Sequence, residues 1–583
     1  MLTKEKIRNL LFKTFQQIKK ENSYSFDFLK SDIGIISQQI KERGDYSSNF
    51  PFLIAKKANL DPQKIAQIFQ EKIENQKINK KINFLEKIQN EKGFLNFYIK
   101  KEFVLKDFLN FLEKEKINIK RKKKGKVIID FSSPNIAKPM HVGHLRSTLL
   151  GDALAKLFEL FDYKVIRWNY LGDWGTQFGK LILAYKLWGD PEKLKKDPIN
   201  YLLELYQRLH QELKANPSLE EKAQKEFALL EKGDPENKKL WQLFLKLSLK
   251  EFKKTYKLLK VKFDLFLGES FFAKKQNQLI EILKRKNLLK ESEGALIVDL
   301  SEFNLPPALI FKKDEAGLYL TRDLTALFYR IKKYRPEKIL YVVGNEQTLH
   351  FNQLFAIFKK IEKKLKTELI HVKFGLVLAP EGKKFSSREG EMILVDDLIK
   401  EAFLKCLKII QEKNKNWPQE KQIKVAQKIA LSLIKFNTLK TYRLNDVVFD
   451  WKKILDVKGK TSIYLQYTFA RLNKILRKAK KEKISFLEKK KLFFEKEKEW
   501  EIIKKILDFQ DSLEASLNLY SLHPLANYLL SLADLMNQYY ETIPILKEEN
   551  ENKKLSRLFL VKKVINIFEI SFSLLGIEPL KEI

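Results

Sequence analysis

The sequence predicts an α/β domain built on a parallel sheet, flanked by a smaller α+β domain and an all-α domain. Short apolar runs at 126–131, 165–168 and 338–343 are typical of buried strands. Long charged helical stretches separate these runs, as in Rossmann-type folds, where helices connect parallel strands. After about residue 456 the pattern is almost entirely helical.

A chain of 583 residues is too long for a single hydrophobic core. The lysine-rich run at 121–124 marks the first boundary, directly before the first strand of the α/β domain. We expect four regions: an amino-terminal domain at 1–118, a Rossmann-type domain at 119–400 with a helical insertion at about 186–295, a helical junction at 401–455 and a helical domain at 456–583.

Composition limits the functional classes. The formal net charge is +38, which favours a polyanionic partner such as nucleic acid, although a lysine-rich composition accounts for part of this excess. Cys406 is the only cysteine, so neither a disulfide framework nor a cysteine zinc cluster is possible, and a reducing, cytoplasmic setting fits. The charged amino terminus and the lack of long apolar stretches predict neither secretion nor membrane insertion.

The stretch from 126 to 151 concentrates the chemistry. A strand at 126–131 is followed by Pro134 and Pro139, after which the pattern becomes helical. His141 and His144 therefore lie in the first helical turn and share one face. A helix amino terminus attracts phosphate, and two imidazoles there add donors for phosphate oxygens. Gly143 permits close approach to the backbone, and Lys138 adds a fixed charge.

His141-Val142-Gly143-His144 resembles the HIGH signature of class I aminoacyl-tRNA synthetases, and the string SSPNIAKPMHVGHLRST at 132–148 resembles its arginyl-tRNA synthetase version. The resemblance implies an ATP-dependent arginine–tRNA ligase. Its substrates would be L-arginine, tRNA(Arg) and ATP, with Mg²⁺ carried by ATP and no dedicated metal site in the protein. We expect a monomer in which arginine activation waits for bound tRNA.

A second signature combines a strand pattern at 374–378 with the stretch Gly382-Lys383-Lys384-Phe385-Ser386-Ser387-Arg388-Glu389-Gly390, which resembles the KMSKS loop. The family's second lysine falls at Ser387, so Lys138 or Arg388 would have to supply the missing charge. The resemblance implies catalytic roles for Lys138, His141, His144 and Lys384. It implies ATP contacts for Ser132, His141, Gly143, His144, Gly344, Val377, Lys384 and Ser386.

The arginine site is expected near Tyr319 and Asp323. These residues are four apart, so a helix beginning near Thr321 would direct both into one pocket. A carboxylate can accept two parallel N–H bonds from a guanidinium, and a phenol offers an oxygen or a ring face. By resemblance, Gln347, Asn135 and Asp130 complete this pocket.

Contacts with tRNA are expected at three places. Residues 93–98 read as a glycine turn and an edge strand, and the region resembles the family's elbow-binding domain, with Phe94 and Asn96 as contacts. Here Glu91-Lys92-Gly93-Phe94 replaces the usual Gly-Pro-Gly-Phe. Trp174 lies in a glycine-rich loop and serves either packing or ligand binding. The stretches 464–471 and 574–583 resemble the anticodon-binding domain, where Tyr464, Tyr467, Arg471 and Tyr540 either stack on bases or pack in the core.

Two other classes of function share some of these features. A small-molecule nucleotidyltransferase can have the HxGH helix, but such enzymes lack both flanking domains. A non-catalytic RNA-binding relative would be expected to lack the histidines or Lys384, and both are present. Among class I synthetases, the cysteinyl type normally has zinc-binding cysteines, which a chain with one cysteine cannot provide.

Overall fold

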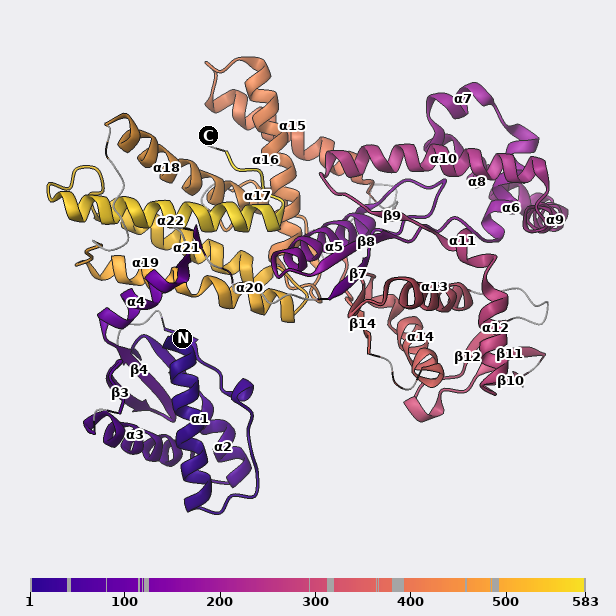
Figure 1. Cartoon of the computed structure of the whole chain (residues 1–583). Coiled ribbons are helices and arrows are strands. Elements are labelled where there is room, and N and C mark those ends of the chain that lie inside the picture. Colours follow the sequence, from indigo (N-terminus) through magenta and orange to yellow (C-terminus); the bar gives the residue numbers. More distant parts are fainter. Residues whose placement is uncertain are drawn as a thin grey trace.

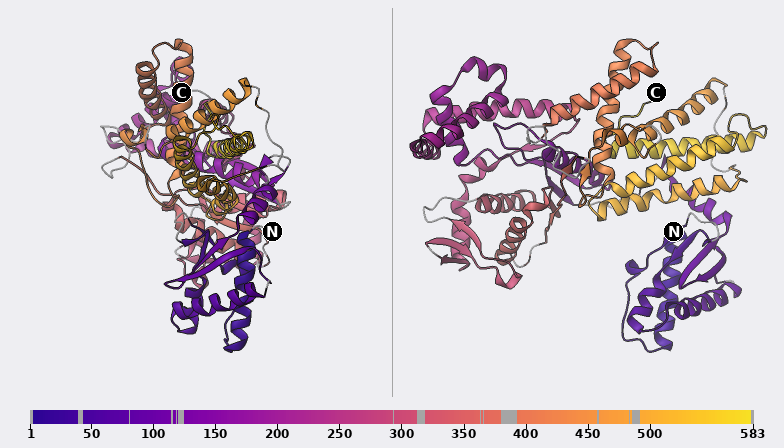
Figure 2. Two further views of the ribbon diagram at one scale, coloured as in Figure 1. Left: turned by 90° about the vertical axis from the view of Figure 1, so that its left-hand side faces the viewer. Right: turned by 180° about the vertical axis from the view of Figure 1, so that it is seen from behind.

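A computed structural model of the chain describes residues 3–38, 43–79, 81–113, 116–117, 119, 125–292, 294–311, 319–362, 364, 366–379, 393–456, 459–482, 484 and 492–580. Figure 1 shows a central sheet with the carboxyl-terminal helices on one side and a helical insertion on the other. The amino-terminal domain lies beside the carboxyl-terminal helices, and the view from behind in Figure 2 shows the same arrangement.

The amino-terminal domain is a four-stranded antiparallel sheet, in the order β1-β2-β4-β3, packed against helices. The predicted edge strand at 93–98 is wrong in one respect, because β4 lies inside the sheet between β2 and β3. Leu95 and Phe97 are fully buried, which an edge position would not require. The elements are α1 (Thr3–Glu21), η1 (Lys30–Asp32), β1 (Ile36–Ser37), β2 (Tyr46–Ser48), α2 (Phe50–Ala58), α3 (Pro62–Ile78), β3 (Leu85–Glu91), β4 (Phe94–Ile99) and α4 (Lys101–Phe111), followed by a hairpin of β5 (Leu112–Glu113) and β6 (Lys116–Ile117).

The central sheet has five parallel strands in the order β14-β13-β7-β8-β9. The chain runs outward from β7 to β8 and β9, then returns to the other side of β7 as β13 and β14. Ligands bind where the strand order reverses in this way, here at the carboxyl ends of β7 and β13. The strands are β7 (Lys126–Asp130), β8 (Lys164–Asn169), β9 (Leu265–Phe266), β13 (Lys338–Tyr341) and β14 (Glu368–His371), with α5 (Val142–Leu160), α13 (Tyr319–Tyr334), η4 (Asn345–Gln347) and α14 (Thr348–Ile361) between them.

The insertion lies between β8 and β9 and is helical. Its helices are α6 (Thr176–Trp188), α7 (Pro191–Lys196), α8 (Pro198–Ala215), α9 (Ser218–Lys232) and α10 (Pro235–Leu258). The structure differs from the predicted insertion at 186–295, because β9 falls within that range and pairs with β8. Beyond β9 the chain forms α11 (Glu269–Ala273), α12 (Gln276–Arg285) and a separate antiparallel sheet of β10 (Leu289–Ser292), β11 (Ala295–Val298) and β12 (Ala308–Phe311), with η3 (Ser301–Phe303) before β12.

After β14, the only strands among the residues that the structure describes are β15 (Val377–Leu378) and β16 (Val447–Val448), which pair in parallel. The helices are α15 (Val395–Lys413), α16 (Gln419–Lys440), α17 (Trp451–Ile454), α18 (Ser462–Lys481), α19 (Glu497–Leu507), α20 (Phe509–Asn518), α21 (His523–Thr542) and α22 (Glu551–Leu575). Ion pairs of Lys4 with Asp508 and of Lys504 with Asp45, both at 2.7 Å, join the amino-terminal domain to this helical domain. In the described ranges, no helix combines the length and apolar character needed to cross a bilayer.

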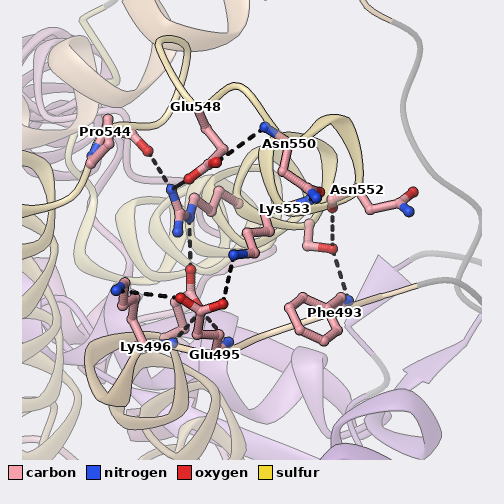
Figure 3. A network of polar contacts seen from close by, with 11 residues as sticks. Phe493, Glu495, Lys496, Pro544, Glu548, Asn550, Asn552 and Lys553 are labelled. Carbon is pink, nitrogen blue, oxygen red and sulfur yellow. Dashed lines mark hydrogen bonds and ion pairs between the residues drawn. The ribbon is translucent and has the colours of Figure 1, made fainter.

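A buried charge network centred on Arg557 organises the helical domain, and Figure 3 labels its members Pro544 and Glu548. Arg557 and Glu499 are each 1% exposed and form an ion pair at 2.8 Å between α22 and α19. Arg557 also donates to the carbonyl of Pro544 at 2.7 Å and pairs with Glu548, while Glu499 accepts the N–H groups that precede α19. Every charge in the buried pair therefore has a partner, as a low-dielectric interior requires.

Replacing Arg557 with Met should destabilise this domain, because it leaves the Glu499 carboxylate buried without a cation. Breaking a buried pair in this way costs about 3–5 kcal/mol. Faster hydrogen exchange of the α19 and α22 amides would report the loss. The matched control is Lys553→Met, which breaks the more exposed Lys553–Glu495 pair and should leave exchange unchanged. Equal effects of the two variants would contradict the assignment.

Candidate active site

A cavity of about 730 Å³ opens at the carboxyl ends of β7 and β13. Segments far apart in the sequence meet there: the chain after β7, the start of α5, the start of α13, the chain after β13 and residues 374–377, which lead into β15. Most predicted ATP and arginine contacts line it together, namely Asp130, Ser132, Asn135, His141, Gly143, His144, Tyr319, Asp323, Gly344, Gln347 and Val377. Lys384 and Ser386 lie outside the described residues.

The two histidines are fixed by the first turn of α5. His141 is the N-cap, and its Nδ1 accepts the Gly143 N–H at 3.1 Å, while Nδ1 of His144 accepts the His141 N–H at 3.2 Å. Burial lowers the pKa of His141 to about 4, and burial together with His141 lowers the pKa of His144 to about 3. Both rings are therefore neutral at pH 7, and each carries its proton on Nε2, ready to donate to an anion without bringing positive charge.

The chain between β7 and α5 has an unusual backbone. Ser132, Ser133 and Ala137 have φ angles of 74°, 46° and 61°, in the left-handed region that non-glycine residues rarely adopt. Hydrogen bonds hold it: Ser132 N–H donates to Ser147 Oγ of α5 and Ala137 N–H to Ser248 Oγ of α10, both at 2.9 Å. Ser132 Oγ also lies 2.8 Å from the hydroxyl of Tyr256.

Close backbone contact places Asn135 beside the loop after β8. Asn135 forms a bridge with Gly172, and a Cβ on Gly172 would lie 1.9 Å from Asn135 Oδ1. Only glycine can occupy position 172 without moving Asn135 out of the cavity wall. The glycine-rich loop therefore determines where Asn135 points.

Arg146 of α5 forms hydrogen bonds with the chain that precedes the second signature. Its guanidinium donates to the carbonyls of Leu376 at 2.7 Å, Asn445 at 2.6 Å and Arg443 at 3.0 Å. Burial lowers the pKa of Arg146 to about 10, so it remains charged at neutral pH. This single side chain holds β15 and the 443–445 segment against the helix that carries both histidines.

The chain on the far side of the second signature also contacts the first. Val142 N–H donates to the carbonyl of Ile393 at 3.1 Å, and Val395 N–H to that of Met140 at 2.9 Å. Residues 380–392, with Lys384, Ser386, Ser387 and Arg388, lie outside the described residues. The described residues on both sides of this segment are bonded to α5, because Leu376 accepts from Arg146 and Ile393 accepts from the Val142 N–H.

Lys138 does not line the cavity in the part of the chain that the structure describes. Its Nζ lies 5.0 Å from the ring centroid of Tyr206 on α8, a cation–π contact. Its predicted contact with phosphate in place of the lysine missing at Ser387 stays a prediction.

The end of the cavity that is predicted to bind arginine contains more ionisable groups than the sequence suggested. Tyr319 opens α13 and is 58% exposed at the mouth, and Asp323 lies one turn further. His350 Nε2 lies 2.6 Å from Asp323 Oδ2. Glu269, the first residue of α11, also lines the cavity and pairs with Arg322 at 3.0 Å. Burial, with help from Asp323 and Asp173 and against Arg322, raises the pKa of Glu269 to about 8.

Sequence reasoning missed several residues of the cavity wall, among them Glu269 and Arg330. Glu269 follows a two-residue strand, too short to recognise from periodicity. Arg330 lies seven residues after Asp323 on α13, and this two-turn spacing was an available signal. Arg330 pairs with Asp130 at 2.6 Å, so the Asp130 carboxylate, predicted to bind arginine, already holds an internal guanidinium.

The residues predicted to contact tRNA differ in accessibility. Phe94 is 43% exposed, whereas Asn96 is buried and bonded to Ser47 and Glu91. Both line a small cavity of about 150 Å³. The structure places Trp174 in the core, edge-on to Phe227 and Trp241 with centroids 5.7 Å away, so its ring cannot stack on a base and packing is the better interpretation.

In the helical domain, Arg471 lies between Tyr467 and Tyr540, with Cζ 4.9 Å from each ring centroid. Both tyrosines are more than 40% exposed, at 42% and 44%. Tyr464 is more constrained, because its hydroxyl bonds Asp534 at 2.6 Å and accepts from Asn537 at 3.0 Å. The exposed Tyr467–Arg471–Tyr540 stack therefore has the form of a base-stacking platform.

Comparisons with known proteins cover the whole chain. Residues 108–451 match the family profile described as the catalytic domain of class I tRNA synthetases (R). Residues 4–99 match the arginyl tRNA synthetase N terminal domain, and residues 465–583 match the DALR anticodon binding domain. Both flanking matches argue against the small-molecule nucleotidyltransferase alternative.

Individual relatives agree with these profiles. The chain is 39% identical over 571 residues to the arginine–tRNA ligase of Clostridium botulinum (strain Okra), covering 97% of this chain and 98% of that protein. It is 41% identical over 542 residues to the arginine–tRNA ligase of Clostridioides difficile (strain 630), covering 92% and 93%. The crystal structure of arginyl-tRNA synthetase from Plasmodium falciparum aligns with a TM-score of 0.83 at 28% identity, covering 99% of each chain. From the fold, the cavity with its two signatures and these full-length similarities, we conclude that the chain belongs to the arginyl-tRNA synthetases of class I.

Proposed function

We propose that this protein is an arginine–tRNA ligase whose cavity binds ATP against α5 and L-arginine against α13. The observation that carries this proposal is the meeting of two neutral histidines, at one end, with Asp323, Tyr319 and Glu269 at the other. The first group suits a triphosphate and the second a guanidinium. The fold and the family assignment support the same activity.

In the first step, a carboxylate oxygen of arginine attacks the α-phosphorus of ATP, and the bond to pyrophosphate breaks. The product is arginyl-adenylate. In the second step, a hydroxyl of the terminal ribose of tRNA, the 2′-hydroxyl by class expectation, attacks the carbonyl carbon and AMP leaves. No protein nucleophile is required, so catalysis comes from positioning and charge stabilisation.

The nucleotide site uses dipoles and hydrogen bonds more than fixed charge. The amino terminus of α5 and the Nε2–H groups of His141 and His144 would donate to phosphate oxygens. Positive charge would come from Mg²⁺ entering with ATP and from Lys384 on the second signature. Ser132, Gly143, Gly344 and Val377 would line the nucleotide.

The arginine site would hold the guanidinium between Asp323 and Glu269, with the Tyr319 ring at the mouth. Asn135 and Gln347 would contact the other polar groups of the amino acid. We further propose that Phe94 contacts the tRNA elbow, that the Tyr467–Arg471–Tyr540 stack contacts anticodon bases, and that the enzyme works as a cytoplasmic monomer.

Pyrophosphate exchange with each amino acid in turn, with and without tRNA(Arg), tests the activity. Among the amino acids, only arginine should support exchange, and this exchange should require tRNA(Arg). Exchange with another amino acid but not with arginine would overturn the substrate assignment. Exchange with arginine in the absence of tRNA would overturn only the coupling.

Replacing Asp323 with Asn should weaken arginine binding about 10²-fold, because a charged hydrogen bond to the guanidinium is lost. The measurement is KM for arginine in aminoacylation, and KM for ATP should not change. Asp299→Asn is the control, because this carboxylate pairs with Lys290 outside the cavity. An unchanged KM for arginine in the Asp323→Asn variant would show that the guanidinium binds elsewhere.

The raised pKa of Glu269, about 8, predicts a pH dependence. At pH 7 the carboxyl is mostly protonated, and deprotonation toward pH 9 creates the charge that the guanidinium needs. Arginine affinity should therefore rise about tenfold from pH 7 to pH 9, one decade per unit below the pKa. Calorimetric titration of the protein–tRNA complex measures this, and Glu269→Gln should flatten the profile. Any slope that remains in the Glu269→Gln variant comes from other groups of the complex.

A further inference from the structure

Helix α13 carries residues of the arginine site at one end and a buried cation further along. Tyr319 and Asp323 lie in its first two turns, and Arg330 follows two turns after Asp323 on the same side. Arg330 is 1% exposed and Asp130 is 4% exposed. The Arg330 Nη2 donates to Asp130 Oδ2 at 2.6 Å, so a buried ion pair joins α13 to the end of β7.

Aromatic rings on the neighbouring strands fix the guanidinium in place. Its Cζ lies 4.5 Å from the ring centroid of Trp168, 5.3 Å from Tyr341 and 5.4 Å from Tyr170. Trp168 belongs to β8 and Tyr341 to β13, the two strands that pair with β7. A planar guanidinium can stack on such rings while it donates to a carboxylate, and a lysine ammonium cannot reproduce this geometry.

The second oxygen of Asp130 continues the connection. Ser133 Oγ donates to Asp130 Oδ1 at 3.2 Å, and Ser133 lies in the left-handed turn that leads to the histidines. Both oxygens of Asp130 therefore have internal partners, one on α13 and one on the signature turn. The connection runs from Arg330 through Asp130 to Ser133.

We propose that Arg330 is a positioning residue that aligns the arginine site on α13 with the nucleotide site on the turn after β7, and that Asp130 transmits this alignment instead of contacting the substrate. The proposal rests on the proposed function. In a reaction without covalent catalysis, the arginine carboxylate must lie in line with the α-phosphorus. A small shift of α13 against β7 would disturb the alignment of the arginine carboxylate with the α-phosphorus, although each substrate could still bind.

The test is Arg330→Lys, measured by the single-turnover rate of arginyl-tRNA formation and by KM for arginine and ATP. A displacement near 1 Å costs about 10² in rate, so the rate should fall about 10²-fold while both KM values change less than threefold. Arg335→Lys is the matched control, an exposed arginine just beyond the same helix, and it should behave as wild type. A tenfold rise in KM for arginine with an unchanged rate would overturn the proposal.

A double-mutant cycle with Asp130→Asn tests the connection itself. Asp130→Asn should lower the rate as Arg330→Lys does, and the double variant should be no slower than either single one. If Asp130 bound the substrate instead, Asp130→Asn would raise KM for arginine, and the two effects on kcat/KM would multiply. Either result sinks the proposal. Should Arg330→Lys fail to fold, Asp130→Asn alone still distinguishes a positioning role of Asp130, which lowers the rate, from substrate binding, which raises KM for arginine. Wild-type protein that forms no arginyl-tRNA would refute the ligase assignment rather than this inference.

Discussion

The active site depends on a left-handed turn that the sequence does not favour. Ser132, Ser133 and Ala137 adopt φ angles that cost roughly 1–2 kcal/mol each for residues with a Cβ. Side chains on two helices, Ser147 of α5 and Ser248 of α10, accept the N–H groups of this turn and stabilise it. Because α10 belongs to the insertion, the insertion is part of the support of the active site and not merely an appendage. Through this turn, one short segment contacts the sheet, α5 and the insertion at once.

Charge is distributed unevenly between the two ends of the cavity. At the end that is predicted to bind the nucleotide, both histidines are neutral at pH 7, and Arg146 donates to three backbone carbonyls. At the end that is predicted to bind arginine, three of the carboxyl groups that line the wall have internal basic partners: Asp130 pairs with Arg330, Glu269 with Arg322 and Asp323 with His350. Two of these partners are arginines, whereas Asp323 is paired with the imidazole of His350.

The hydrophobic periodicity of the sequence predicted those elements of the site whose structure is determined by residues close in sequence. The strands at 126–131, 165–168 and 338–343 and the helix that begins at His141 all appear where periodicity placed them. Features set by distant contacts were not predictable in this way. The central position of β4, the burial of Trp174 against Phe227, the short strand β9, and the Asp130–Arg330 pair all require partners from far along the chain. The cation–π contact between Lys138 and Tyr206 of α8 was likewise not predictable from neighbours in sequence.

The bonds of Arg146 have an implication for how this protein can vary. All three of its acceptors are main-chain carbonyls, at positions 376, 443 and 445, and Arg443 in turn donates to the carbonyls of Lys373 and Leu519. A guanidinium that donates only to main-chain carbonyls makes the same hydrogen bonds whichever side chains the acceptor residues carry. Drift toward a lysine- and isoleucine-rich composition can therefore replace the residues at positions 376 and 445 while the geometry survives, provided that Arg146 and Arg443 are kept.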